Sequence, residues 1–221
     1  MEIGEIRKAI GEWSKARTSS DDVLTYLKQG TCFKIEKSNY NLWKTKSPKE
    51  LHVYLGVFNG QLQFVLIDSE SDKDPAVNIG SIVVQDYYPG LNVQDAGLID
   101  HATDGSIKVV DALKRVMKWT MFMESWVKDC VKSDAGVFQA FVIPFSDLSS
   151  QFEAAGSHET LVVFGLNGKN ADLMLWGMPS NAGGSGVRAM ASAIDDGDVG
   201  YPVEDLSTPC PPFHNSGLGL L

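Results

Sequence analysis

Two runs rich in apolar residues flank an Asn-Gly pair in the stretch 53-VYLGVFNGQLQFVLI-67. Asn59-Gly60 between such runs favours a two-residue type I′ turn, because both residues tolerate a positive φ. This turn predicts a hairpin in which Val57 lies opposite Leu62. The register then directs one set of apolar side chains to the same face, which we expect to be the core face: Val53, Leu55, Val57, Leu62, Phe64 and Leu66.

The opposite face of this hairpin mixes polar and apolar residues. It carries His52, Tyr54 and Gln63 beside apolar neighbours. Such a face is typical of neither a core nor a surface. We expect either that another element partly covers it or that a ligand binds there, so these three residues are candidate ligand-binding residues.

Helical periodicity marks three other segments. Residues 2–17 place apolar side chains at three- and four-residue spacing, which predicts an amphipathic helix. A short helix is expected next, with Ser19 or Ser20 as its N-cap and Gly30 at its end. The longest helix is predicted over 106–132, where apolar residues cover so wide an arc that we expect it to be largely buried.

The remaining apolar runs are short and lie between turn residues, as strands do. They occupy residues 32–35, 78–85, 137–143, 160–166 and 172–177, with a helical turn expected near 145–154. The pattern predicts an α+β fold. We expect a mostly antiparallel five- or six-stranded sheet, one long buried helix packed against it, and N-terminal helices.

The composition changes near residue 179. Residues 1–178 read as a single α+β domain, whereas residues 179–221 are rich in Gly, Pro, Asp and Ser. We expect this C-terminal tail to pack on the domain or on a neighbouring subunit.

The charge balance excludes two classes of partner. The chain has 221 residues and a formal net charge of -9. Nonspecific nucleic-acid binding depends on phosphate neutralisation by Lys and Arg, so we expect no nucleic acid, and no anionic membrane surface, as a partner. No apolar run approaches the roughly 20 residues of a membrane span. The three cysteines are odd in number and widely separated, which suits a reducing compartment and a cytoplasmic location.

A search for metal and cofactor motifs is negative. In the acidic loop 68-DSESDKDPAVNI-79, Lys73 stands where an EF-hand needs Gly and Ile79 where it needs Glu. We therefore expect a solvated loop there rather than a calcium site. Cys210 and His214 form one close pair of ligands, whereas zinc needs about four ligands. Nucleotide-binding and Gly-x-Ser-x-Gly motifs are missing from the sequence, so we expect no metal and no cofactor.

One group of titratable residues could support catalysis. The turn-rich segment 86–105 brings Asp100, His101 and Asp104 just before the predicted long helix. A histidine beside carboxylates can transfer protons. Asp104 is equally suited to cap the helix, and His101 to lie exposed.

Two functional hypotheses follow. The first is a protein of unknown function that acts as a soluble, non-enzymatic binding or assembly module and can form a homo-oligomer or bind a protein partner. The alternative is a small-molecule enzyme, hydrolase-like, that uses His101 with Asp100 or Asp104.

Overall fold

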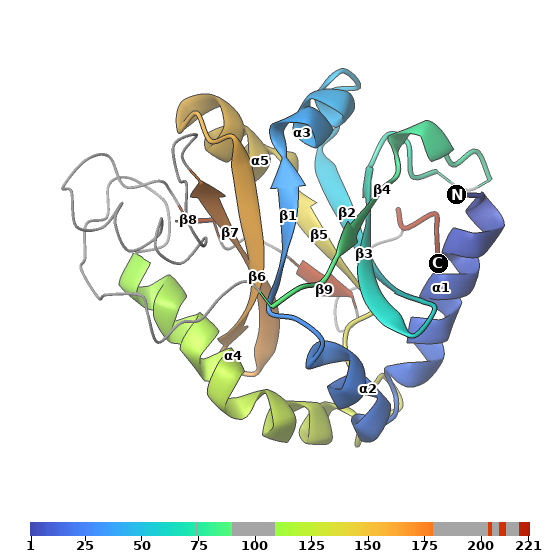
Figure 1. Ribbon diagram of the computed structural model, residues 1–221, viewed down its shortest axis with the longest axis vertical. Helices are drawn as coiled ribbons and strands as arrows, with labels where there is room; N and C mark the ends of the chain where they lie inside the picture. Colours follow the sequence, from blue (N-terminus) through green and yellow to red (C-terminus); the bar gives the residue numbers. More distant parts are fainter. Residues whose placement is uncertain (74, 90–108, 179–202, 205–207, 211–216) are drawn as a thin grey trace.

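The computed structural model describes residues 1–73, 75–89, 109–178, 203–204, 208–210 and 217–221 of the chain (Figure 1). These residues form α-helices together with two antiparallel β-sheets, so the predicted α+β class is confirmed. The strands that were expected in one sheet of five or six divide between a five-stranded and a four-stranded sheet.

The five-stranded sheet contains the hairpin around Asn59-Gly60. Both turn residues have positive φ, 51° for Asn59 and 79° for Gly60, and Val57 pairs with Leu62. The predicted turn and register are therefore confirmed. Its strands follow the order β4 (Val83–Asp86), β3 (Gln61–Asp68), β2 (Glu50–Phe58), β5 (Ala140–Pro144) and β9 (Thr208–Cys210).

The four-stranded sheet is built on the second hairpin. Its two long strands meet at a turn formed by Gly168 and Lys169, where Gly168 has a φ of 62°. The strand order is β1 (Cys32–Glu36), β6 (Glu159–Asn167), β7 (Asn170–Met178) and β8 (Val203–Glu204).

An aromatic core lies between the two sheets. Phe33 of β1 stacks on Phe64 of β3 with ring centroids 4.1 Å apart, and Phe164 of β6 lies 6.0 Å from Phe64. Each sheet buries an apolar face here, which explains why the strands form two packed layers. The six hairpin side chains that were predicted to face the core are all buried in it: Val53, Leu55, Val57, Leu62, Phe64 and Leu66.

Helix α1 (Ile3–Ala16) covers the outer face of the five-stranded sheet (Figure 1). Its apolar stripe follows the predicted spacing, and Ile6, Ile10 and Trp13 are buried. Helix α2 (Ser20–Leu27) begins at Ser19, whose side chain accepts a hydrogen bond from the backbone N–H of Asp22, as predicted for an N-cap.

The predicted long helix is α4 (Val109–Cys130), which packs against β6 and α2. Its buried face includes Trp119, whose ring stacks on Phe164 at 4.8 Å. The face turned away from the core leaves Met117, Met121 and Phe122 exposed, so the prediction that this helix is largely buried is wrong, because it packs against the core along one face only. The remaining short elements are α3 (Lys37–Lys44), η1 (Ile79–Ser81), α5 (Phe145–Ser149) and η3 (Ser150–Ala154).

Candidate functional site

A buried polar cluster lies on the outer face of the first hairpin. Strand β2 supplies His52 and Tyr54, and the segment after β3 supplies Asp72. The Nδ1 of His52 donates a hydrogen bond to Oδ2 of Asp72 over 2.6 Å, and the Tyr54 hydroxyl donates to the same oxygen. All three residues are at most 1% exposed. Because the carboxylate accepts two buried donors, it determines the orientation of both rings.

Helix α1 and the last residues of the chain cover this face. Tyr54 packs in a second apolar cluster with Ile6 and Ile10 of α1 and with Leu220. The mixed pattern of the hairpin therefore has a structural cause, because the face is buried beneath a helix and a peptide segment.

The third predicted ligand-binding residue lies apart from the other two. Gln63 pairs with Gly56, whereas His52 pairs with Ile67 further along the strand. The Gln63 side chain is half-buried and donates to Oδ1 of Asp86 over 2.6 Å. The structure thus brings His52 and Tyr54 together and leaves Gln63 at the β3–β4 pairing.

The segment that supplies Asp72 was expected to be a solvated loop, and that expectation is wrong for three of its residues. Asp68, Ser71 and Asp72 are buried. The backbone N–H of Asp72 donates to the carbonyl of Asp68 over 3.1 Å, which makes a helical turn and directs these side chains inward. The ammonium of Lys46 lies 3.7 Å from Oδ2 of Asp68 and compensates its buried charge. In the sequence, Asp68, Ser71 and Asp72 are three and four positions apart, and this spacing was the available indication that they lie on one side of a helical turn.

A hollow of about 330 Å³ lies beside the polar cluster. Glu50, His52, Asp72 and Lys73 line it together with Gly217, Leu218 and Gly219. Nε2 of His52 lies 3.6 Å from a Glu50 carboxylate oxygen, and among the described residues it has no hydrogen-bond partner. A histidine held by a carboxylate is a common acid–base arrangement, but within the same residues no nucleophilic side chain bonds to Nε2. No group of three His, Cys, Asp or Glu residues in this part of the chain could hold a metal ion.

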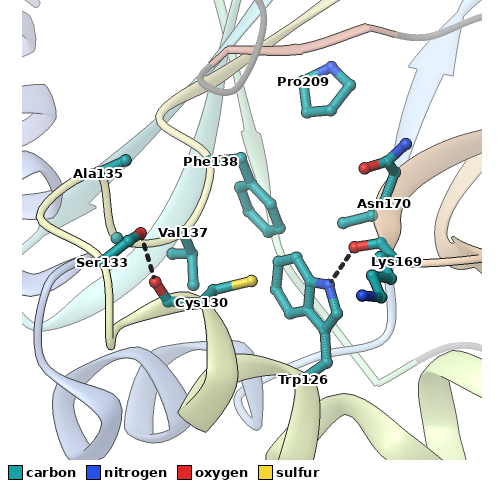
Figure 2. A pocket seen from close by; sticks show the side chains of 11 residues that line it. Trp126, Cys130, Ser133, Ala135, Val137, Phe138, Lys169, Asn170 and Pro209 are labelled. Carbon is teal, nitrogen blue, oxygen red and sulfur yellow. Dashed lines mark hydrogen bonds between the residues drawn. The ribbon is translucent and has the colours of Figure 1, made fainter.

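A second hollow, of about 170 Å³, has two aromatic side chains among the eleven residues that line it (Figure 2). Trp126 of α4 and Phe138 form its floor, with ring centroids 5.8 Å apart and planes inclined by 25°. The Trp126 indole N–H donates to the carbonyl of Lys169 over 2.8 Å, which fixes the ring between α4 and the β6–β7 turn. We call this hollow the aromatic pocket.

The wall formed by residues 133–138 is held by the end of α1. The Arg17 guanidinium donates to the carbonyl oxygens of Ala135 and Val137. Gly136 has a φ of 63°, and a Cβ at this position would lie 2.4 Å from the Arg17 carbonyl oxygen. Only glycine fits so close an approach at this φ, so the wall has a defined conformation.

Cys130 contributes a thiol to the same pocket. Burial raises the pKa of this thiol, and the neighbouring Asp129 carboxylate raises it further. The thiol therefore stays protonated near neutral pH and packs as a small apolar group rather than acting as a nucleophile. The sequence offered no specific signal for this pocket, because Trp126, Phe138 and Lys169 belong to three separate segments.

The other sequence-based candidates lie outside the described residues. These are Asp100, His101 and Asp104 in the segment 86–105, together with His214 and the side chain of Cys210. The catalytic hypothesis for Asp100, His101 and Asp104 stays a prediction.

The fold and these hollows define an α+β protein with two packed antiparallel sheets, an outer helix and an aromatic pocket at one end of its core. Comparison with protein-family models, with curated proteins and with solved structures found no match. Within the described part of the chain, no helix has the length and apolar character that crossing a membrane requires.

Proposed function

We propose that this protein is a non-enzymatic binding module whose aromatic pocket takes one small planar group. The observation that carries the proposal is the pair of stacked rings, Trp126 and Phe138, at the floor of a hollow with a fixed wall. An apolar cavity of about 150 Å³ is large enough for benzene. The pocket, at about 170 Å³, therefore suits a single aromatic ring or a side chain of that size.

The polar groups at the rim indicate which substituent the ring carries. The Lys169 and Asn170 side chains lie on the wall opposite Ser133 and Ala135 (Figure 2). An ammonium and a carboxamide N–H both donate hydrogen bonds. The ligand class is thus a small aromatic compound, or an aromatic side chain, with a carboxylate or another hydrogen-bond acceptor.

Three probes test this proposal by NMR: benzoate, indole and cyclohexanecarboxylate. We expect benzoate to shift the Trp126 indole N–H resonance at lower concentration than the non-aromatic cyclohexanecarboxylate does. Indole, which lacks the carboxylate, should bind more weakly than benzoate. The proposal fails if none of the three shifts that resonance at millimolar concentration.

A matched pair of variants at Cys130 locates the binding. Cys130→Phe places an additional ring in the aromatic pocket, and we expect it to reduce benzoate affinity at least tenfold. Cys130→Ser keeps the volume of the pocket and should bind benzoate within about threefold of the original chain. Equal affinities for the two variants, both shown to be folded by circular dichroism, would place the binding elsewhere.

A further inference from the structure

A histidine nitrogen without a hydrogen-bond partner lies beside the hollow of about 330 Å³ on the outer face of the first hairpin. The His52 side chain is only 2% exposed, and its Nδ1 donates to Asp72 over 2.6 Å. Because Nδ1 holds the proton, Nε2 of the neutral ring carries a lone pair and is a hydrogen-bond acceptor. Among the described residues, none donates to Nε2. A buried acceptor costs free energy until it receives a donor, so this nitrogen favours a ligand that brings one.

A second acceptor lies next to this nitrogen. A carboxylate oxygen of Glu50 is 3.6 Å from Nε2 of His52. That distance is too long for a hydrogen bond, and two acceptors cannot bond to each other without a proton between them. One nitrogen that carries two or more N–H groups can donate to both. Nε2 is itself buried, whereas the Glu50 side chain is 41% exposed, so an outward turn of Glu50 gives a ligand access to the ring.

The charges around the hollow favour a cation as the ligand. Glu50 and Asp72 line the hollow with two carboxylates, and the Asp72 side chain is fully buried. Among the described residues that line it, the one lysine or arginine is Lys73. The Lys73 ammonium lies 2.5 Å from the carboxylate of Glu70, which compensates its charge. The negative charge that remains attracts a positively charged ligand and repels an anion.

The other lining residues indicate an organic cation rather than a metal ion. The half-buried Leu218 borders the hollow and packs against the apolar cluster that α1 forms with the sheet. Its side chain provides an apolar wall for a short alkyl chain. In the described part of the chain, no three His, Cys, Asp or Glu residues could hold a metal ion together. Nε2 of His52 and the Glu50 carboxylate are two ligands, fewer than a transition metal such as zinc requires.

We propose that this hollow binds a small primary alkylammonium ion. The ammonium donates one N–H to Nε2 of His52 and one to the carboxylate of Glu50. Its third N–H faces the hollow, and its alkyl chain lies against Leu218. An ammonium has three donors and no acceptor, which matches a pair of adjacent acceptors in a negatively charged site. The site shares no lining residue with the aromatic pocket and does not depend on the proposed function.

NMR of the full chain, labelled with ¹⁵N at its histidines, measures the binding at the Nε2 resonance of His52. We expect propylammonium to shift this resonance saturably at millimolar concentration, because Nε2 gains a donor. Tetramethylammonium carries the same charge but no N–H group, so it should bind at least tenfold more weakly. The proposal is overturned if propylammonium leaves the resonance unchanged, or if the two cations bind equally well, since the hollow would then attract any cation.

Glu50→Gln and Glu124→Gln form a matched pair of variants that locates the binding. Each removes one negative charge from a side chain that is 41% exposed at Glu50 and 55% exposed at Glu124, but only Glu50 borders the hollow. We expect Glu50→Gln to weaken propylammonium binding at least fivefold and Glu124→Gln to leave it within about twofold. If Glu50→Gln is poorly folded by circular dichroism, Glu50→Asp replaces it, with the same expected loss because its carboxylate is further from Nε2. Equal affinities for the folded variants would overturn the assignment of the ammonium to this hollow.

Discussion

The imidazole of His52 and the carboxylate of Asp72 are 20 positions apart in sequence and meet over 2.6 Å in a buried hydrogen bond. The Tyr54 hydroxyl donates to the same carboxylate oxygen. One acidic residue of the segment after β3 thus accepts a hydrogen bond from each of two side chains on the outer face of the hairpin, where both the histidine and the tyrosine are buried.

Removing the Asp72 carboxylate should therefore destabilise the fold. Asp72→Ala leaves two buried donors without an acceptor, and each unsatisfied donor costs about 1–3 kcal/mol, so we expect a loss of roughly 3 kcal/mol in the free energy of unfolding. Asp72→Asn retains a carbonyl acceptor and should lose about half as much. Urea denaturation followed by circular dichroism measures both.

Glu70→Ala is the matched control in the same segment. Glu70 forms an exposed ion pair with Lys73, and such pairs contribute little to stability. A similar loss for Asp72→Ala and Glu70→Ala would contradict the role assigned to the buried carboxylate.

Alanine substitutions at Gly136 and Gly168 test whether the contact with Arg17 makes the wall of the aromatic pocket rigid. Their φ values are 63° and 62°, but a Cβ would clash only at Gly136, where it meets the Arg17 carbonyl oxygen. Gly168→Ala should cost about 1 kcal/mol for the left-handed conformation alone. Gly136→Ala adds a steric clash with the backbone and should cost roughly 2 kcal/mol more. Thermal unfolding of the two variants compares them directly, and equal losses would mean that the wall readily moves away from Arg17.

The raised pKa of the Cys130 thiol predicts a characteristic pH dependence of alkylation. Thiolate is the reactive form, so modification of Cys130 by iodoacetamide should stay slow through the usual thiol pKa of about 8.5 and accelerate at higher pH. In urea, the same residue should follow the ordinary thiol profile. Mass spectrometry of the peptide containing Cys130 gives the alkylation rate with and without urea. The same pH dependence in both conditions would contradict the effect of burial on the thiol pKa.

The same shift determines the sign of the pH effect on stability. The pKa of the Cys130 thiol is higher in the folded chain than in the unfolded chain, so the unfolded chain loses its proton first as the pH rises. The free energy of unfolding should therefore decrease above about pH 8.5. The Cys130→Ala variant should lack this part of the decrease.

Local chemistry made several elements predictable. The Asn59-Gly60 turn specifies the register of its hairpin, because both positive φ values are needed and only a few residue types adopt them. The stripe of Ile6, Ile10 and Trp13 predicts α1 because one turn of helix brings them to the same side. These relations involve residues that are neighbours in the chain, so the sequence contains both partners in order.

The sites were less predictable than the fold. His52 and Tyr54 were singled out from the pattern of the hairpin, but the residue that joins them, Asp72, was expected in solvent. The acidic segment offered only a spacing, and the spacing does not reveal that Asp72 meets His52 and Tyr54. Trp126 and Phe138 were expected in a buried helix and a strand, without any indication that a hollow lies between them.

The sequence by itself determined the α+β class, the hairpin around Asn59-Gly60 and the helical stripes, since periodicity and turn chemistry act over a few residues. Only the tertiary structure decided that the strands divide into two packed sheets, that Asp72 meets His52 and Tyr54 on the outer face of the hairpin, and that Leu220 packs against α1. The physical reason is that apolar burial is non-directional: a sequence shows which faces must be covered, whereas the packing of the whole chain decides what covers them.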